Sequence, residues 1–469
     1  MNDASKLDEP YTDEMTLEER EATYQKFVWD NLPRNFAANF MHGMLGMTGF
    51  RIVVNTPTFI PVYLHMLAGG ASALFPAPLR MFVNPDALVG LGLSLQQVGQ
   101  VISPIFGASQ IEHRKKVLPV SVLMGTLMRV QILGMAISGW FLSGAPLLFA
   151  MLVFLTLLGL FSGAQRVAFQ LLLAKVIPIS RRGTLQGWRN VTGSLLAAIL
   201  SYVAGRYLVG AHPYSLGAKV LGVQLYHNGY STTFFLAFVL TSLGLTALQV
   251  LLREPEPPKL RPQMKVSDRL RDLPGLLKHD KGFMYFMIAQ ICAMASRIAA
   301  PFYILFARNT IELTGANIGL LSVAFVMGDA LSNIPWGYLG DKSGFRSTFI
   351  IALVLWIAAT MTLLLGHVPW LVFVAFFGLG AAQSGYQMSS QTMVLEFGLR
   401  EDMAMRLAFS STAEGLMLTL GPLMGGLIAA IAGYSTLFVI SMTFEAVALA
   451  ILLVLVEEPR TRKPLPVRV

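Results

Sequence analysis

Long apolar segments recur along the whole chain, and short polar connections separate them. Each segment reaches the about 20 apolar residues that a helix needs to cross a bilayer. The pattern predicts an all-α membrane protein. Its twelve spanning helices are expected at residues 36–67, 88–109, 118–142, 146–174, 185–210, 233–252, 283–308, 315–338, 347–366, 369–397, 407–432 and 434–456.

The composition agrees with this pattern. The chain is 54% hydrophobic and 13% charged, with a mean hydropathy of +0.60, whereas soluble domains are about 25% charged. The net charge is +9, but the positions of the charges matter more than their sum. We therefore expect a lipid bilayer rather than a nucleic acid as the partner. A single cysteine, Cys292, excludes an internal disulfide and leaves no Cys-based metal site.

Basic residues gather in every second connection. The connection after the sixth helix alone holds eight lysines and arginines, whereas the alternate connections carry chiefly Arg80, Lys219 and Arg308. By the positive-inside rule, both termini are then cytoplasmic. The sequence predicts a multi-pass protein of the cytoplasmic (inner) membrane.

The chain divides into two halves with short flanking segments. Residues 1–35 lack an apolar signal core, and Thr16-Leu17-Glu18-Glu19 matches a capping box. We expect a short acidic helix along the inner surface there; a disordered tail is the alternative. The proline-rich, then charged segment 253–282 separates a six-helix bundle at 36–252 from one at 283–456, and a cytoplasmic tail follows at 457–469.

The two halves also repeat one another. Arg51-Ile-Val-Val-Asn-Thr-Pro57 in the first predicted helix parallels Arg297-Ile-Ala-Ala-Pro301 in the seventh. Gly159 to Gln165 in the fourth parallels Gly378 to Gln383 in the tenth. A charge at membrane depth costs at least ~2.5 kcal/mol, so it normally faces protein or a water-filled cavity. A matching arginine in each half therefore indicates a duplicated bundle around a polar pathway.

Twelve helices in two halves joined by a basic loop resemble the major facilitator superfamily. The most specific likeness is Gly337-Tyr-Leu-Gly-Asp341-Lys342-Ser-Gly344-Phe-Arg346, which matches the family's loop signature. Its glycines permit a tight reversal, and the carboxylate and cations can pair across neighbouring helix ends. By this resemblance Gly337, Asp341, Lys342, Gly344 and Arg346 are assigned to gating. The alternative is a generic turn with solvated charges.

The first-half copy of this loop departs from the signature. Gly107-Ala-Ser-Gln-Ile-Glu112-His-Arg114 has its acid one position late and lacks the second glycine. Glu112 and Arg114 are candidates for the gate in this half, but the basic triplet could serve only as a topological anchor. A second likeness, Gly421-Pro422-Leu-Met-Gly425-Gly426, lies in the eleventh helix rather than the fifth, where the family's antiporters have it. Close helix packing explains its glycines equally well.

In the resembling family the first, fourth, seventh and tenth helices surround the substrate path. Polar residues at helical spacing on these four helices are the predicted substrate site: Arg51, Asn55, Arg166, Gln170, Gln290, Arg297, Gln383, Gln387 and Gln391. Interhelical hydrogen bonding is the alternative for any single glutamine. Arginine binds carboxylate or phosphate with two hydrogen bonds, so three arginines favour an anionic substrate.

Two carboxylates oppose that interpretation. Asp329 and Glu414 could neutralise Arg297 or Arg166 as buried pairs, or carry protons. A proton-coupled neutral or amphipathic substrate therefore remains open. Arg129 and Glu445 lie on helices that are usually peripheral in this fold, and we interpret them as packing or snorkelling residues. Trp356 falls mid-helix and is expected to pack toward lipid.

No catalytic constellation, cofactor motif or metal-ligand spacing is present in the sequence, so we expect neither an enzyme nor a cofactor. The hypothesis is a monomeric secondary active transporter that moves a small organic solute by alternating access, coupled to protons. The alternative of another class is an assembly or pigment-delivery factor of this fold without solute turnover.

Overall fold

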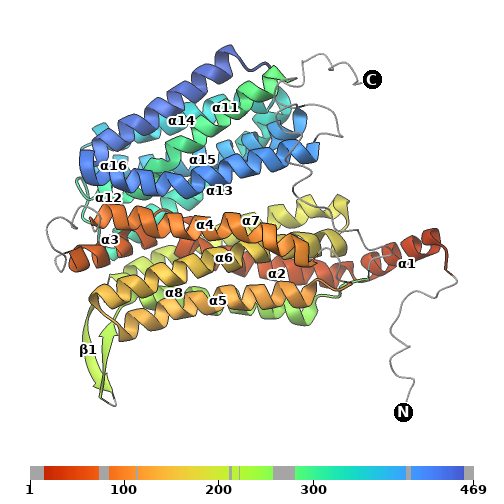
Figure 1. The fold of residues 1–469 in the computed structure, drawn as a ribbon, viewed down its shortest axis with the longest axis horizontal. Coiled ribbons are helices and arrows are strands. Elements are labelled where there is room, and N and C mark those ends of the chain that lie inside the picture. The colour runs from red at the N-terminus through yellow and green to blue at the C-terminus, as the bar shows by residue number, and fades with distance from the viewer. Residues whose placement is uncertain are drawn as a thin grey trace.

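Two helical bundles lie side by side in the computed structural model (Figure 1). The structure describes residues 15–72, 84–111, 115–210, 214–220, 222–256, 280–397 and 403–458; Glu112 and Arg114 lie outside these ranges. The first bundle consists of α2 (Leu32–Phe50), η1 (Arg51–Asn55), α3 (Phe59–Ser72), α4 (Pro85–Ile111), α5 (Leu118–Phe141), α6 (Gly144–Val176), α7 (Ile179–Val203), η3 (Ala204–Val209) and α8 (Gly229–Leu251). The second consists of α11 (Lys281–Ala295), η4 (Ser296–Phe302), α12 (Tyr303–Ala307), α13 (Gly315–Ser343), α14 (Phe345–Leu365), α15 (Pro369–Glu396) and α16 (Met403–Val454).

The predicted spans correspond to these helices. Eight helices of the described ranges are long and apolar enough to cross a membrane by length and composition. One of them, α16, is continuous over both of the last two predicted spans, but Gly433 at φ 80° breaks it between them. Glycine tolerates this left-handed backbone because it has no Cβ. The remaining predicted spans correspond to α4, α15 and the interrupted run from α2 to α3.

The first and seventh spans are interrupted, which the sequence pattern did not predict. Arg51–Asn55 is a π-helix, and Thr56 is extended before α3 begins at Phe59. Ser296–Phe302 is a 3-10 helix containing Pro301. A proline lacks the N–H that an α-helix bonds to the carbonyl four residues earlier, so Pro57 and Pro301 cannot supply that bond to Val53 O and Arg297 O. Two side chains bond other carbonyls at these interruptions. The Thr56 hydroxyl donates to Arg51 O at 2.7 Å, and Ser441 donates to Ser296 O at 2.6 Å.

Two elements mark the ends of the molecule. Helix α1 (Leu17–Asp30) has the predicted capping box, in which Thr16 and Glu19 exchange hydrogen bonds. At the opposite end, strands β1 (Ser215–Val220) and β2 (Val223–His227) form an antiparallel hairpin that projects from the first bundle (Figure 1). The terms "α1 end" and "hairpin end" are used below for these two ends.

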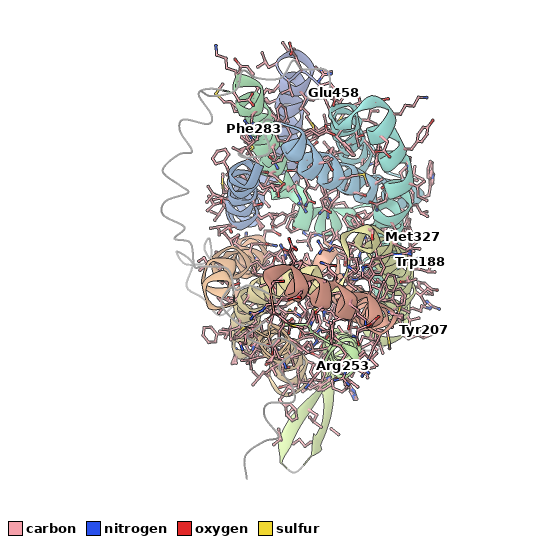
Figure 2. All side chains as sticks on the ribbon, turned by 90° about the vertical axis from the view of Figure 1, so that its right-hand side faces the viewer. Trp188, Tyr207, Arg253, Phe283, Met327 and Glu458 are labelled. Carbon is pink, nitrogen blue, oxygen red and sulfur yellow. The ribbon has the colours of Figure 1, made fainter. Side chains whose placement is uncertain are left out.

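The bundles contact each other closely in the half nearer the hairpin end. A Cβ on Gly205 would collide with Gly315 O, and one on Gly90 would collide with Pro422 O. These glycines let backbones approach where larger side chains would hold them apart. Farther toward the α1 end, Val326 packs with Ala197 and Ala198. Figure 2, which looks from the α1 end, shows Met327 and Trp188 near this junction.

Candidate substrate cavity

A cavity of about 450 Å³ lies between the two bundles. Its volume lies within the roughly 300–1,000 Å³ typical of small-molecule sites. Eight predicted residues line it: Arg51, Arg166, Arg297, Asp329, Gln383, Gln387, Gln391 and Glu414. Both arginines of the repeated phrases thus face one space, and each belongs to an interrupted helix.

Three other predicted substrate residues lie elsewhere or are not described. Gln170 is exposed and is not among the lining residues, although it lies one turn from Arg166. Gln290 is 1% exposed and lies behind the wall. Asn55 belongs to η1, but its side chain lies outside the described part of the structure. On α6, and on the run from α11 to η4, one residue of each helically spaced pair lines the cavity and the other does not, so helical spacing alone does not determine which residues meet it.

Arg51 and Asp329 form an ion pair that joins the two bundles. Arg51 Nη2 lies 2.6 Å from Asp329 Oδ2, and the two side chains are 16% and 14% exposed. Two turns nearer the hairpin end, Thr58 Oγ1 of the first span and Ser322 Oγ of α13 are 2.6 Å apart and buried. The expectation that Asp329 would neutralise Arg297 or Arg166 is therefore wrong, because Asp329 pairs with Arg51. The first span and α13 are held together at two levels.

Arg297 lies on the opposite side of the cavity, among the polar residues of the second bundle. Its Nη2 donates to Gln383 Oε1 at 3.2 Å, and Glu414 is close enough to attract its charge. Glu414 Oε1 accepts hydrogen bonds from Gln290 Nε2 at 2.9 Å and from the Tyr386 hydroxyl at 3.2 Å. Gln290 is therefore a support for Glu414 rather than a lining residue.

Arg166 has the longest hydrogen bond of the three arginines. Its side chain is exposed to the cavity, and its Nη2 reaches Gln100 Oε1 only at 3.5 Å. No carboxylate in the described part of the chain pairs with it. Arg166 is thus the cavity guanidinium that the protein holds with its weakest contact.

Sequence reasoning missed two groups of lining residues. Gln96, Gln97 and Gln100 line the cavity from α4, although an amide cluster within an apolar helix was visible in the sequence. Trp356 also lines it: this side chain is 2% exposed, and its Nε1 donates to the Tyr303 hydroxyl at 3.3 Å. The expectation that Trp356 packs toward lipid is therefore wrong. A buried indole N–H needs an acceptor, which lipid tails do not offer.

The loop between α13 and α14 adopts the reversal expected of its glycines. Gly344 has φ 82° and separates the two helices. Arg346 donates to Leu452 O at 3.0 Å and to Leu453 O at 3.2 Å, so it contacts the last turns of α16 within its own bundle. Lys342 Nζ lies 5.7 Å from the ring centre of Tyr338. The hydrogen bonds described for this loop thus remain inside the second bundle.

The Gly421–Gly426 segment packs two neighbours onto α16. A Cβ on Gly425 would collide with Ile298 O of η4, and one on Gly426 would lie 2.5 Å from Asp86 O of α4. The close-packing interpretation of this motif therefore agrees with the geometry. Because η4 carries Arg297 and α4 belongs to the other bundle, this segment joins the cavity wall to the contact between bundles.

Comparisons with known proteins identify the family. The family model for the Major Facilitator Superfamily matches residues 40–307 and 285–469. The multidrug resistance protein MdtG of Salmonella arizonae is 24% identical over 420 residues, covering 88% of this chain and 92% of that protein. A D-xylose-proton symporter superposes with a TM-score of 0.68 at 14% identity, covering 92% of this chain and all of that one. The nucleoside transporter NupG superposes with a TM-score of 0.59 at 12% identity, covering 89% of this chain and 97% of that one. The chain therefore belongs to the Major Facilitator Superfamily and is a multi-pass membrane transporter.

Proposed function

We propose that this protein is a secondary active transporter of a small organic anion, working by alternating access and coupled to protons. The charge balance of the cavity carries this proposal. Three guanidinium groups line it against two carboxylates, Asp329 and Glu414, so one positive charge is in excess. A fixed positive charge in a site shielded from bulk water attracts an anionic group more strongly than it would in water.

Arg166 is the proposed primary contact for the anionic group. It has no carboxylate partner among the described residues, whereas Arg51 is paired with Asp329. Arg297, Gln383 and Gln387 then orient the remainder of the solute, with Gln391 nearer the α1 end. A substrate anion that engages Arg51 competes with Asp329 for the same donors. Release of Asp329 from Arg51 makes it available to a proton, as does release of Glu414 from its donors.

The charges at the two ends of the molecule support one membrane orientation. Lys115, Lys175, Arg182, Arg346 and Arg406 lie on connections or helix ends at the α1 end, whereas Lys219 and Arg308 are at the hairpin end. By the positive-inside rule we propose that the α1 end and both termini face the cytoplasm and that the protein lies in the inner membrane. In this orientation the tight contacts between bundles close the outer side. The loop that holds Gly337, Asp341, Lys342, Gly344 and Arg346 is proposed to serve gating at the inner side.

A neutral or amphipathic substrate is the second candidate. One supporting observation is the Arg51–Asp329 pair, in which one cation and one anion of the cavity neutralise each other. Another is the apolar lining by Met294, Phe325 and Trp356. The similarity to a multidrug resistance protein also favours it.

A thermal-shift screen of the purified protein tests the two candidates, because a ligand that binds the folded state raises its melting temperature. Organic anions, neutral sugars and amphiphilic drugs are compared on the unchanged protein and on Arg166→Gln. Stabilisation by anions that Arg166→Gln loses supports the proposal. Stabilisation by neutral compounds alone, equal in both proteins, overturns the anion assignment.

Gln170→Ala is the matched control, since Gln170 lies on the same helix outside the cavity lining and its removal should leave the shift unchanged. Uptake of a stabilising compound into sealed vesicles, with and without a pH gradient, then tests turnover. A ligand that binds but never accumulates would overturn its assignment as the transported solute.

A further inference from the structure

Glu414 is a carboxylate of the cavity wall without a cationic partner. It lines the cavity from α16 and is half-buried. None of the ion pairs of the described residues includes it. Arg297, the cavity cation of the same bundle, directs its Nη2 to Gln383 Oε1 at 3.2 Å instead. The second bundle therefore presents a carboxylate and a guanidinium to one space without joining them in an ion pair.

The protein holds one oxygen of Glu414 and leaves the other without a donor. Oε1 accepts hydrogen bonds from Gln290 Nε2 at 2.9 Å and from the Tyr386 hydroxyl at 3.2 Å. Gln290 Nε2 also donates to Ser410 Oγ at 2.8 Å, which holds the amide in place. No described residue donates to Oε2. Each carboxylate oxygen accepts about two hydrogen bonds, so Glu414 has acceptor capacity left for a donor in the cavity.

Aromatic side chains gather in the same wall of the cavity. Tyr303, Trp356 and Tyr386 line it from the second bundle. The rings of Trp356 and Tyr386 meet edge to face with their centres 6.4 Å apart, and Trp356 Nε1 donates to the Tyr303 hydroxyl at 3.3 Å. Tyr386 is also the residue whose hydroxyl contacts Glu414. Because aromatic rings attract cations, rings beside a carboxylate suit an ammonium group.

Two cavity arginines remain for acidic groups of a ligand. Arg51 is paired with Asp329, whereas Arg166 and Arg297 form no ion pair with a described residue. Arg166 extends from α6 of the first bundle and Arg297 from η4 of the second. Each guanidinium can bind a carboxylate with two hydrogen bonds. The charges of the cavity lining that are not already paired are thus two cations and the anion of Glu414.

We infer that the transported solute is an amino acid with a second acidic group. Its ammonium group contacts Glu414 and one carboxylate contacts Arg297, both in the second bundle, while the other acidic group contacts Arg166 in the first. Such a solute carries two negative charges and one positive charge, which balance the unpaired charges of the cavity. Its two ends bridge the two bundles. The inference rests on the proposed transport of an organic anion and narrows its substrate class.

Three five-carbon acids separate the contributions of the charged groups. Glutarate has two acidic groups and no amine, glutamate has two acidic groups and an amine, and norvaline has an amine and one acidic group. Each is titrated into the purified full-length protein while the melting temperature is measured, because a ligand that binds the folded state raises it. We expect glutamate to bind about 10–100-fold more tightly than either of the other two, since each of them lacks one charged contact.

Variants of Glu414 test which residue meets the amine. Glu414→Gln should bind glutamate and glutarate equally, whereas Glu414→Asp, which keeps the negative charge, should still prefer glutamate. Glu312→Gln is the matched control, because Glu312 is an exposed loop residue outside the cavity lining, and it should behave as the parent. Equal binding of glutarate and glutamate by the parent, or a preference for glutamate that persists in Glu414→Gln, overturns the inference.

The same titrations distinguish the failure of this inference from the failure of the proposed function. If glutarate binds as tightly as glutamate and Arg166→Gln abolishes both, the anion assignment stands and the amine contact is wrong. If none of the three acids raises the melting temperature, the inference is wrong, and the anion assignment then depends on the other organic anions of the screen. Stabilisation by neutral compounds alone removes both proposals.

Discussion

Arg51 of the first span and Asp329 of α13 face each other across the junction of the bundles, with Nη2 and Oδ2 2.6 Å apart. Arg51→Gln removes the cation and leaves Asp329 without its ionic partner. Because the pair is partly exposed, we expect a cost of about 1–3 kcal/mol to the closed arrangement. The closed hairpin end should then open more often. A cysteine replacing Ile60, in a Cys292→Ser background, should react faster with a maleimide.

The reversed pair Arg51→Asp with Asp329→Arg is the control, because it restores opposite charges at the same positions. Its labelling rate should return toward that of the parent. Equal rates for the parent and Arg51→Gln would show that the pair does not hold the bundles together.

The Thr58–Ser322 contact allows the same arrangement of the bundles to be tested with a disulfide cross-link. The two hydroxyl oxygens are 2.6 Å apart and buried, so cysteines at both positions are close enough for a disulfide without large movement. Oxidation of Thr58→Cys with Ser322→Cys, in the Cys292→Ser background, should consume both thiols. Transport should stop and recover on reduction. Each single-cysteine protein should be insensitive to oxidant. Two free thiols after oxidation, or full transport by the cross-linked protein, would contradict this arrangement.

Two glycines of the Gly421–Gly426 segment allow a matched comparison of how an added methyl group changes protein stability. A Cβ on Gly425 would collide with the backbone oxygen of Ile298, whereas one on Gly421 would meet its nearest neighbour, Ile298 Cγ2, at 3.6 Å. Gly425→Ala should destabilise the protein by about 1–3 kcal/mol through overpacking. Gly421→Ala should be neutral or raise stability by up to ~1 kcal/mol, as alanine favours the helix. Melting temperatures in detergent check the difference, and equal values would refute the close approach of α16 to η4.

The sequence predicted the helices because apolar length follows from bilayer thickness. It also identified Arg51 and Arg297, because a cation in an apolar helix has few acceptable surroundings. The breaks beside them were missed, although Pro57 and Pro301 were visible, because apolar periodicity alone does not register a lost backbone donor. Attention to the proline after each arginine would have revealed both.

The interaction partners of the cavity residues were harder to predict than the helix faces on which these residues lie. Helix spacing placed Arg166 and Gln170 on one side of α6, but only the packing of the bundles determines that Arg166 meets the cavity and Gln170 does not. The partner of Asp329 depends on how two bundles, far apart in sequence, lie against each other. The side-chain amides of α4 were overlooked because only the first, fourth, seventh and tenth predicted helices were expected to surround the substrate path.

The two breaks described above have a mechanical consequence. Beyond each break, only a short segment, α3 or α12, continues toward the hairpin end, and these two segments touch each other. Segment α3 follows the break beside Arg51, and α12 follows the break that contains Arg297. A ligand that binds either guanidinium therefore acts directly on the break, and a movement there is transmitted to the short segments at the hairpin end.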